Sequence, residues 1–306
     1  MMQDALYGGV NAAVLTAMNA DLSVDLDRMA RHCQWLLANG CNGLGVLGTT
    51  GEGNSLGIAE RLSLLEGLVE RGVPATVMMP GTGTTALTDT VLLTRRADEL
   101  GCRGALLLPP FFYKGPSDDG LFAYFSEVIQ RVGGDIRFYL YHFPAQSAVP
   151  FGLELVGRLL RAYPGKVKGI KDSSGDLAAT RAYVAAYARD GFEVYCGDDG
   201  ALHALLQEGG AGSITAAANV GSAISALVCR NWDRQAGAEA QVTLAAIRRV
   251  VRSAGQIPAL KALVARHTGA PSWRNIRPPL LRLSAGQEAD LFAAFDACGL
   301  QLAAAE

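Results

Sequence analysis

The sequence predicts a (β/α)8 barrel that carries a helical extension at its C-terminal end. Eight short apolar runs alternate with longer amphipathic segments along the first three quarters of the chain. The strands are spaced as βα units require, and no Gly-rich dinucleotide-binding turn opens the chain. An open, doubly wound sheet is the competing fold, and the missing turn disfavours it. With 306 residues, half of them hydrophobic, the chain is long enough to bury a large core.

Each predicted strand is a run of four to seven largely apolar residues. In chain order the eight strands are Gly9–Leu15, Gly43–Leu47, Ala75–Met79, Gly104–Leu108, Arg137–Tyr141, Val167–Lys171, Glu193–Cys196 and Gly212–Thr215.

Helical periodicity fills the intervals between these strands, as in Leu56–Gly72, in Thr84–Leu100 before the stop residue Gly101, and in Asp176–Arg189. After Asn231 the strand pattern ends. Three further helices are predicted there, at Trp232–Ser253, Ile257–Thr268 and Ala285–Leu300. We therefore divide the chain into a catalytic barrel, residues 1–230, and a helical extension packed on it, residues 231–306.

Composition limits the possible partners and the compartment. A net charge of −2 gives no basic field for nucleic acid and no strong attraction to an anionic membrane. The six cysteines show no CxxC spacing, which is typical of free core thiols in a reducing compartment. The N-terminal residues lack the pattern of a secretory signal, so a cytoplasmic protein is expected.

Lys171 is the residue with the clearest chemical meaning. It ends the strand Lys166–Lys171, and alternation places it on the face of Val167 and Gly169, opposite Lys166 and Lys168. Burial favours the neutral amine of a lysine, and a neutral amine is a nucleophile toward carbonyl groups. If that face lines a cavity, Lys171 is a Schiff-base lysine; otherwise it is a solvated residue at a strand end.

Active sites of such barrels lie at the carboxyl ends of the strands, and those ends supply a coherent set of groups. Tyr141 ends the strand before that of Lys171, so its phenol could exchange a proton with an imine there. The turn of Thr49 and Thr50 offers hydroxyls and amides to an anion, unless it is an ordinary capping loop. The last two strands add further candidate substrate contacts at the same rim. These are Gly197 and Asp199 after Glu193–Cys196, and Ile214 at the end of Gly212–Thr215.

Other chemistries find no support in the sequence. The four histidines show no metal-ligand spacing, so no metal site is predicted, and no cofactor is needed beyond the lysine imine itself. No GxSxG elbow argues for a serine nucleophile, and no GK[ST] follows the Thr49–Thr50 turn.

In chain order these strand ends resemble the dihydrodipicolinate synthase and N-acetylneuraminate lyase family of class I, pyruvate-dependent aldolases. The matches are Gly48–Glu52, Tyr141 with Pro144, Gly169–Asp172, Gly197–Asp199, Gly212–Asn219 and Arg277–Leu280. The resemblance implies a barrel assembled as a homotetramer. It also implies a Schiff base between Lys171 and pyruvate or another 2-keto acid, whose carboxylate Thr49 and Thr50 hold. The resemblance further implies that Tyr141 acts as the acid and base and that Ile214 lies under the imine.

Departures from the family pattern bear on the substrate. Gln146 stands where dihydrodipicolinate synthases carry an arginine for the carboxylate of the aldehyde, and a neutral amide cannot replace that bidentate contact. Gly200 and Ala216 stand where sialic acid lyases grip a long polyol, which leaves Asp199 and Ser173 as partners for a shorter hydroxylated chain.

The stretch Tyr141–Ser147 is most similar to the 2-keto-3-deoxy sugar acid aldolases and dehydratases, although His142 replaces their usual asparagine. The family's second tyrosine, often donated across a dimer interface, corresponds to Tyr113, with Phe112 as the alternative match.

The sequence thus favours a lyase that cleaves a 2-keto-3-deoxy sugar acid to pyruvate and an aldehyde. A dehydratase, a dihydrodipicolinate synthase and a non-catalytic keto-acid sensor are the alternatives.

Overall fold

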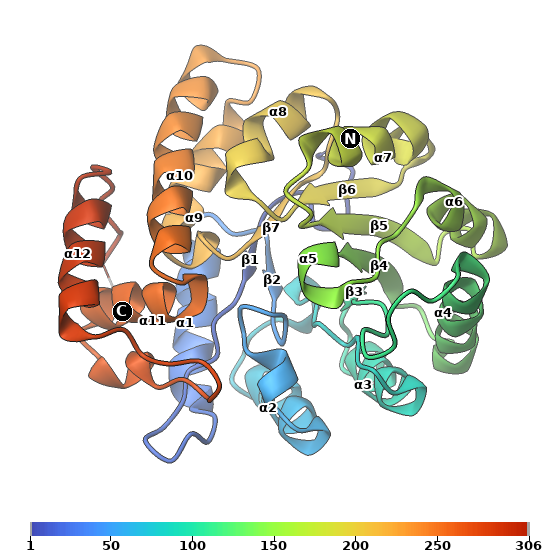
Figure 1. Ribbon diagram of the computed structural model, residues 1–306, viewed down its shortest axis with the longest axis horizontal. Helices are drawn as coiled ribbons and strands as arrows, with labels where there is room; N and C mark the ends of the chain where they lie inside the picture. The colour runs from blue at the N-terminus through green and yellow to red at the C-terminus, as the bar shows by residue number, and fades with distance from the viewer. Residues whose placement is uncertain (1, 305–306) are drawn as a thin grey trace.

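The computed structural model describes residues 2–304, and in this range seven parallel strands form a nearly closed barrel surrounded by helices (Figure 1). The strands follow one another around the barrel in the order β2-β1-β7-β6-β5-β4-β3. Their bounds are β1 Gly9–Ala13, β2 Gly43–Gly45, β3 Gly104–Leu107, β4 Arg137–His142, β5 Val167–Asp172, β6 Glu193–Cys196 and β7 Gly212–Thr215. The predicted barrel fold is confirmed.

The gap between β2 and β3 shows where the strand prediction was wrong. The expected strand Ala75–Met79 begins instead as a single 3₁₀ turn, η2 Ala75–Val77. The extended segment 78–82 that follows takes the eighth place. Its Met79 amide donates to the Leu44 carbonyl of β2, and its Gly81 amide donates to the Val46 carbonyl just beyond β2. On the other side, the Thr82 amide donates to the Leu106 carbonyl of β3, and the Leu106 amide donates to the Pro80 carbonyl. Pro74 and Pro80 lack amide hydrogens, so a regular ladder cannot form here.

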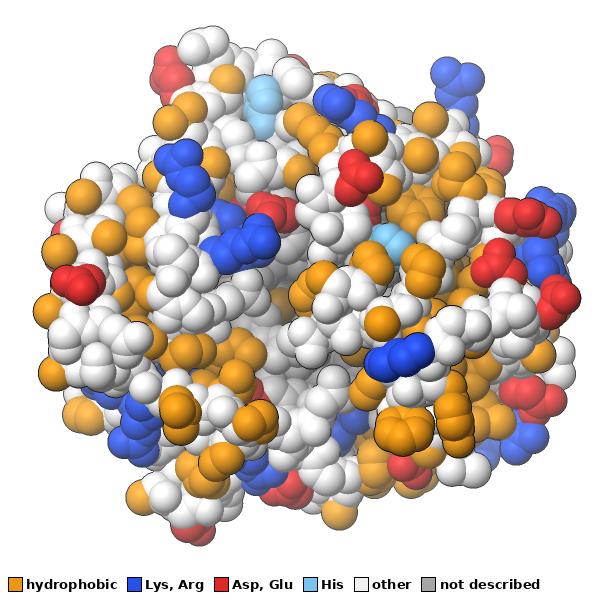
Figure 2. Space-filling model, viewed as in Figure 1, with side chains coloured by type: hydrophobic (Ala, Val, Ile, Leu, Met, Phe, Trp, Pro, Cys, Tyr) orange, Lys and Arg blue, Asp and Glu red, His pale blue; other side chains and the backbone are white. Residues whose placement is uncertain are grey.

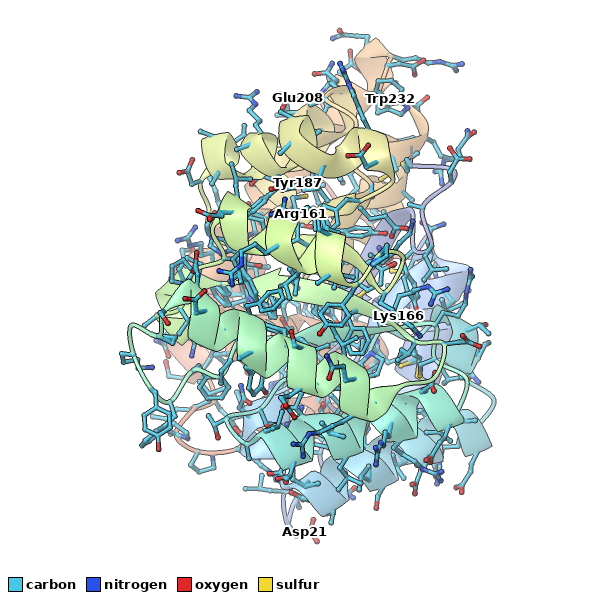
Figure 3. All side chains as sticks on the ribbon, turned by 90° about the vertical axis from the view of Figure 1, so that its right-hand side faces the viewer. Asp21, Arg161, Lys166, Tyr187, Glu208 and Trp232 are labelled. Carbon is cyan, nitrogen blue, oxygen red and sulfur yellow. The ribbon has the colours of Figure 1, made fainter. Side chains whose placement is uncertain are left out.

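Helices cover the outside of the sheet, and Figure 3 looks onto the layer that contains Arg161 of α6 and Tyr187 of α7. The helices are α1 Leu26–Ala38, α2 Ile58–Glu70, α3 Leu87–Glu99, α4 Asp118–Val132, α5 Pro144–Ser147, α6 Leu153–Ala162, α7 Leu177–Tyr187, α8 Leu202–Gln207, α9 Ala218–Arg230, α10 Gln235–Ser253, α11 Gln256–Thr268 and α12 Ala285–Asp296. Four more 3₁₀ turns are η1 Gly53–Ser55, η3 Ala188–Asp190, η4 Asp199–Ala201 and η5 Pro271–Arg274.

The last three helices lie together beside α1 and α9, at the left of Figure 1. α10 packs along α9, and the buried residues Leu244 and Ile247 join the same apolar core as the outward faces of the strands. Trp273 of η5 is fully buried in that core as well. The extension therefore shares one continuous hydrophobic core with the barrel.

The barrel interior holds a layer of buried aromatic residues and one carboxylate. Tyr139 of β4 and Tyr195 of β6 both donate to Glu193 Oε2, at 2.8 and 2.7 Å. The Tyr7 ring packs edge-on against Tyr139, and its hydroxyl donates to the Met78 carbonyl at 2.8 Å. Burial raises the pKa of the Tyr139 and Tyr195 phenols well above their ordinary value, so both remain protonated donors.

Candidate active site

Lys171 and Tyr141 lie side by side at the carboxyl ends of β5 and β4. The two strands pair in parallel with these residues opposite each other, so alternation directs both side chains into the barrel. The Lys171 Nζ lies 4.1 Å from the centroid of the Tyr141 ring, and both residues are buried. A nucleophilic amine and a phenol therefore share one water-poor position at the barrel mouth.

The amine of Lys171 is not committed to another group. Within residues 2–304, no hydrogen bond or ion pair holds its Nζ, and its neighbour is the face of the Tyr141 ring. Likewise, the Tyr141 hydroxyl has no hydrogen-bond partner among the described side chains and backbone groups. The Tyr141 ring itself is held by stacking on Phe143, with centroids 5.8 Å apart. Both reactive groups are thus positioned by packing and free to act on a substrate.

The residues that follow this pair face the other side of the sheet and fix the strand ends. His142 Nδ1 accepts a hydrogen bond from the Phe151 amide at 3.0 Å. The Asp172 carboxylate accepts from the Ser174 amide at 2.8 Å and from Thr180 Oγ1 at 2.7 Å. Burial lowers the pKa of His142, against the opposing effect of Asp172, which favours the neutral imidazole that accepts this bond. His142 therefore anchors the loop that follows β4.

The turn after β2 places two threonines at the same mouth. Thr50 is buried, and Thr49 Oγ1 is a buried atom that has no hydrogen-bond partner within residues 2–304. The turn is tight: a Cβ on Gly53 would lie 2.0 Å from the Leu47 carbonyl oxygen. Thr16 Oγ1 donates to the Gly51 carbonyl at 2.6 Å, which holds the turn against β1. An unpaired buried hydroxyl of this kind is available to a ligand.

Thr49 and Tyr141 line one small cavity of about 10 Å³, together with Arg61 of α2. The Arg61 side chain is buried and donates to the Gly81 carbonyl at 2.6 Å, and its Nε has no partner in the part of the chain that the structure describes. Burial lowers the pKa of Arg61 to about 10. The sequence analysis missed this residue. Its signal is a cation on the apolar face that α2 forms with Leu64 and Leu68.

Ile214, Gly197 and Ser173 also lie at or near the mouth. Ile214 of β7 belongs to the interior cluster that includes Tyr141. A Cβ at Gly197 would lie 1.9 Å from Ser173 Oγ, so the absence of a side chain at 197 makes room for the Ser173 hydroxyl. The Ser173 amide donates to the His142 carbonyl at 2.8 Å, which links the two loops. These positions are compatible with contacts to a substrate held at Lys171.

Asp199 occupies a different environment from the one that the sequence suggested. It is fully buried, and neither of its carboxyl oxygens has a hydrogen-bond partner within residues 2–304. Thr215 and Arg248 act to lower its pKa. Because Ile214 faces the barrel interior, Thr215 faces the helices, and Asp199 lies on that side too. Burial raises the pKa of Asp199 to about 6. Its predicted role toward substrate hydroxyls stays a prediction.

Tyr113 is separated from this cluster in the single chain. It is 78% exposed, its neighbour Phe112 is 70% exposed, and the two rings contact each other at 5.3 Å. No ring contact or hydrogen bond of the described residues joins Tyr113 to Tyr141 or Lys171. Tyr113 could therefore take its predicted catalytic role only if contact between two chains placed it at an active site.

Other features of the described residues have less bearing on catalysis. The face from which α5 projects is hollowed near its centre (Figure 2), and a separate cavity of about 870 Å³ lies beside Tyr7 and Asn42 at the opposite end of the barrel. No cluster of three or more His, Cys, Asp or Glu side chains in residues 2–304 could hold a metal ion. In the same range, no helix is long and apolar enough to cross a membrane.

Comparison with known proteins decides the family. The sequence pattern of the dihydrodipicolinate synthetase family matches residues 6–297. The chain belongs to this family. Members of the dihydrodipicolinate synthetase family are class I aldolases and lyases that form a Schiff base, and the chain is a lyase of that kind.

Two solved structures and one curated sequence illustrate the similarity to the dihydrodipicolinate synthetase family. An uncharacterized DapA-like lyase of Chloroflexus aurantiacus is 35% identical over 94% of this chain and 96% of its own length. A dihydrodipicolinate synthase from Agrobacterium tumefaciens str. C58 superposes with a TM-score of 0.87 at 33% identity, covering 95% of this chain and 99% of its own. YagE, a prophage protein of this family from E. coli K12 solved in complex with pyruvate, superposes with a TM-score of 0.89 at 28% identity. The match covers 97% of this chain and 100% of the YagE chain.

Proposed function

We propose that the protein cleaves a 2-keto-3-deoxy sugar acid to pyruvate and an aldehyde through an imine at Lys171. The observation that carries the proposal is the buried pair of Lys171 and Tyr141, with Nζ 4.1 Å from the ring centroid and both polar groups unpaired within the described residues. A protein that only bound keto acids would need no nucleophile, so this pair favours an enzyme over a sensor.

The reaction follows from the groups present. The Lys171 amine attacks the C2 carbonyl of the substrate, water leaves, and an iminium forms. Tyr141 gives its proton to the departing water, and its phenolate then accepts the proton of the C4 hydroxyl as the C3–C4 bond breaks and the aldehyde departs. The bonding electrons enter the iminium as an enamine, which takes a proton at C3 to give the iminium of pyruvate. Hydrolysis of that iminium then releases pyruvate and restores the amine.

The Thr49–Thr50 turn supplies the contact for the substrate carboxylate in this proposal. The unpaired Thr49 hydroxyl and the buried Thr50 lie in the turn after β2, and Thr49 lines the same cavity as Tyr141. Neutral hydroxyl and amide donors bind a carboxylate without adding a positive charge that would repel the iminium. A fixed carboxylate also holds the C3–C4 bond in the orientation that cleavage requires.

Gln146 supports a hydroxylated aldehyde over a charged one. It lies exposed on α5, the short helix after Tyr141, and its side chain carries no charge. A sugar-derived aldehyde presents hydroxyl groups that an amide and the Ser173 hydroxyl can bind, whereas aspartate semialdehyde presents a carboxylate that calls for a cation.

Dihydrodipicolinate synthesis is the second candidate, because the similar Agrobacterium protein bears that name. Water loss from a related keto-deoxy acid is the third, because dehydration starts from the same iminium. Pyruvate release from a panel of keto-deoxy acids, compared with condensation of pyruvate and aspartate semialdehyde, separates the three. We expect release from a keto-deoxy sugar acid and poor turnover in the condensation.

We further propose that the enzyme works as a homotetramer. The exposed Phe112 and Tyr113 rings form an apolar projection that a second copy would cover, and such a contact would bring Tyr113 to a neighbouring site. Sedimentation analysis of the wild type and of Tyr113→Ser tests this. A wild-type monomer that retained full activity would contradict it.

Trapping the imine tests the mechanism directly. We expect borohydride reduction in the presence of pyruvate to add one reduced pyruvyl group to the protein and peptide mapping to place it on Lys171. Lys171→Met keeps the bulk of the side chain and should abolish both the adduct and the turnover. An adduct on another lysine, or turnover by Lys171→Met, would refute the assignment.

A further inference from the structure

The Thr49–Thr50 turn is tied to the C-terminal extension by a buried ion pair. Glu52 follows the turn directly, and its amide donates to the Thr49 carbonyl at 3.1 Å. The Glu52 carboxylate forms a short ion pair with Lys261 of α11, and the side chains are 0% and 1% exposed. These two residues connect the candidate substrate-binding turn to a helix outside the barrel.

Further contacts complete the connection on both partners. The second Glu52 oxygen, Oε2, accepts from the Arg277 amide at 2.9 Å, and Lys261 Nζ donates to the Asn275 carbonyl at 2.6 Å. The Arg277 guanidinium donates to the Ser55 carbonyl at 2.6 Å and to Glu60 Oε2 at 2.8 Å. The extension thus holds the polypeptide at Glu52, at Ser55 in the loop that follows, and at Glu60 in the first turn of α2.

Stability alone does not account for this arrangement. Charges buried as a pair stabilise a fold no better than apolar residues of similar size, because both ions lose their hydration. Glu52 also holds a left-handed backbone conformation, with φ 54°, which a non-glycine residue adopts only under constraint. An ion pair has a defined direction, so it can fix the position of the turn more specifically than apolar packing does.

We propose that the Glu52–Lys261 ion pair positions the Thr49–Thr50 turn, so that α11 is a working part of the carboxylate-binding site. The inference rests on the proposed function, in which this turn holds the substrate carboxylate. Lys261 has a second effect here, because it neutralises a carboxylate three residues from Thr49. Without Lys261, the Glu52 charge would repel an anionic substrate as well as release the turn.

The experiment compares three variants by borohydride trapping at Lys171. Lys261→Met leaves Glu52 unpaired, and Lys261→Met with Glu52→Gln replaces the pair by neutral groups of similar size. Arg274→Gln is the control, because its paired bonds to Glu288, at 2.7 and 2.9 Å, lie in the same extension but not at the turn. Each protein is titrated with pyruvate and with butanone, a ketone without a carboxylate, well below its unfolding temperature.

We expect Lys261→Met to raise the pyruvate concentration for half-maximal trapping at least tenfold, and the double variant at least threefold. The butanone concentration for half-maximal trapping should change less than twofold in Lys261→Met and in the double variant. Arg274→Gln should lower the unfolding temperature and leave both titrations unchanged.

Two results would overturn the inference. A double variant that titrates with pyruvate like the wild type means that the pair only supports the fold, and this test holds even if Lys261→Met fails to fold. Equal losses for pyruvate and butanone mean that the damage is general and not at the carboxylate. A wild type that forms no pyruvate adduct is a separate outcome, which refutes the proposed function itself and this inference with it.

Discussion

Two tyrosines on β4 should separate catalysis from stability. Tyr139 and Tyr141 share a strand and a face, yet the Tyr139 hydroxyl donates to the buried Glu193 whereas the Tyr141 hydroxyl has no partner within residues 2–304. Tyr141→Phe removes one oxygen and leaves the ring contacts to Lys171 and Phe143 in place. Tyr139→Phe removes a hydrogen bond to a carboxylate that is itself 5% exposed.

The magnitudes follow from these environments. Loss of a positioned acid and base typically costs about 10²- to 10⁴-fold in rate, so kcat of Tyr141→Phe should fall by that factor. Its free energy of unfolding should change by less than about 0.5 kcal/mol, because no hydrogen bond is lost. Tyr139→Phe should lose about 1.5–3 kcal/mol of stability, the typical contribution of a hydrogen bond to a charged group, while its folded fraction turns over normally.

The assay pairs urea unfolding with pyruvate release, and kcat is corrected for the folded fraction. Tyr141→Phe should still give a trapped adduct with pyruvate, because the Lys171 amine is intact. If Tyr141→Phe retained more than about a tenth of the wild-type kcat, or if both variants lost rate equally, the assignment of the proton to Tyr141 would be wrong.

Two further predictions concern stability. Burial lowers the pKa of His32, which contacts Asn219 at 3.0 Å, to about 4, so the folded state resists a proton that the unfolded chain takes up near pH 6.5. This contribution is complete above pH 6.5 and is lost as the pH falls toward 4; it should cost the wild type about 2 kcal/mol between pH 7 and pH 5. His32→Gln should show a correspondingly smaller loss in urea titrations, and an equal loss in both proteins would contradict the reasoning. Gly53→Ala should destabilise the protein by more than about 2 kcal/mol, because its Cβ would lie 2.0 Å from the Leu47 carbonyl oxygen. An alanine variant with an unchanged urea midpoint would show that the turn is looser than described.

Periodicity predicted the parts of the fold whose residues interact locally. Lys171 and Tyr141 could be placed side by side because strand alternation and the order of βα units fix both face and rim. The extended segment 78–82 escaped prediction because Pro80 breaks the alternation on which the strand assignment depends. There the hydrogen bonds of the neighbouring strands, and not local propensity, determine the backbone.

The support of the site was less accessible from the sequence. Arg277 and Glu52 are 225 residues apart, and nothing in either neighbourhood indicates their contact. Asp199 was predicted as a substrate contact from its position after a strand end, and in the structure it is fully buried. Adjacency to a strand end indicates the rim but does not reveal toward which side of the sheet a residue turns once the strand has ended.

The aromatic layer inside the barrel has a consequence for access. Tyr7, Tyr139 and Tyr195 form, with Glu193, a buried layer in the barrel interior, closer to the amino ends of the strands than the reactive lysine. These buried side chains lie between Lys171 and the cavity beside Tyr7, so we expect keto acids to reach the amine from the carboxyl ends of the strands.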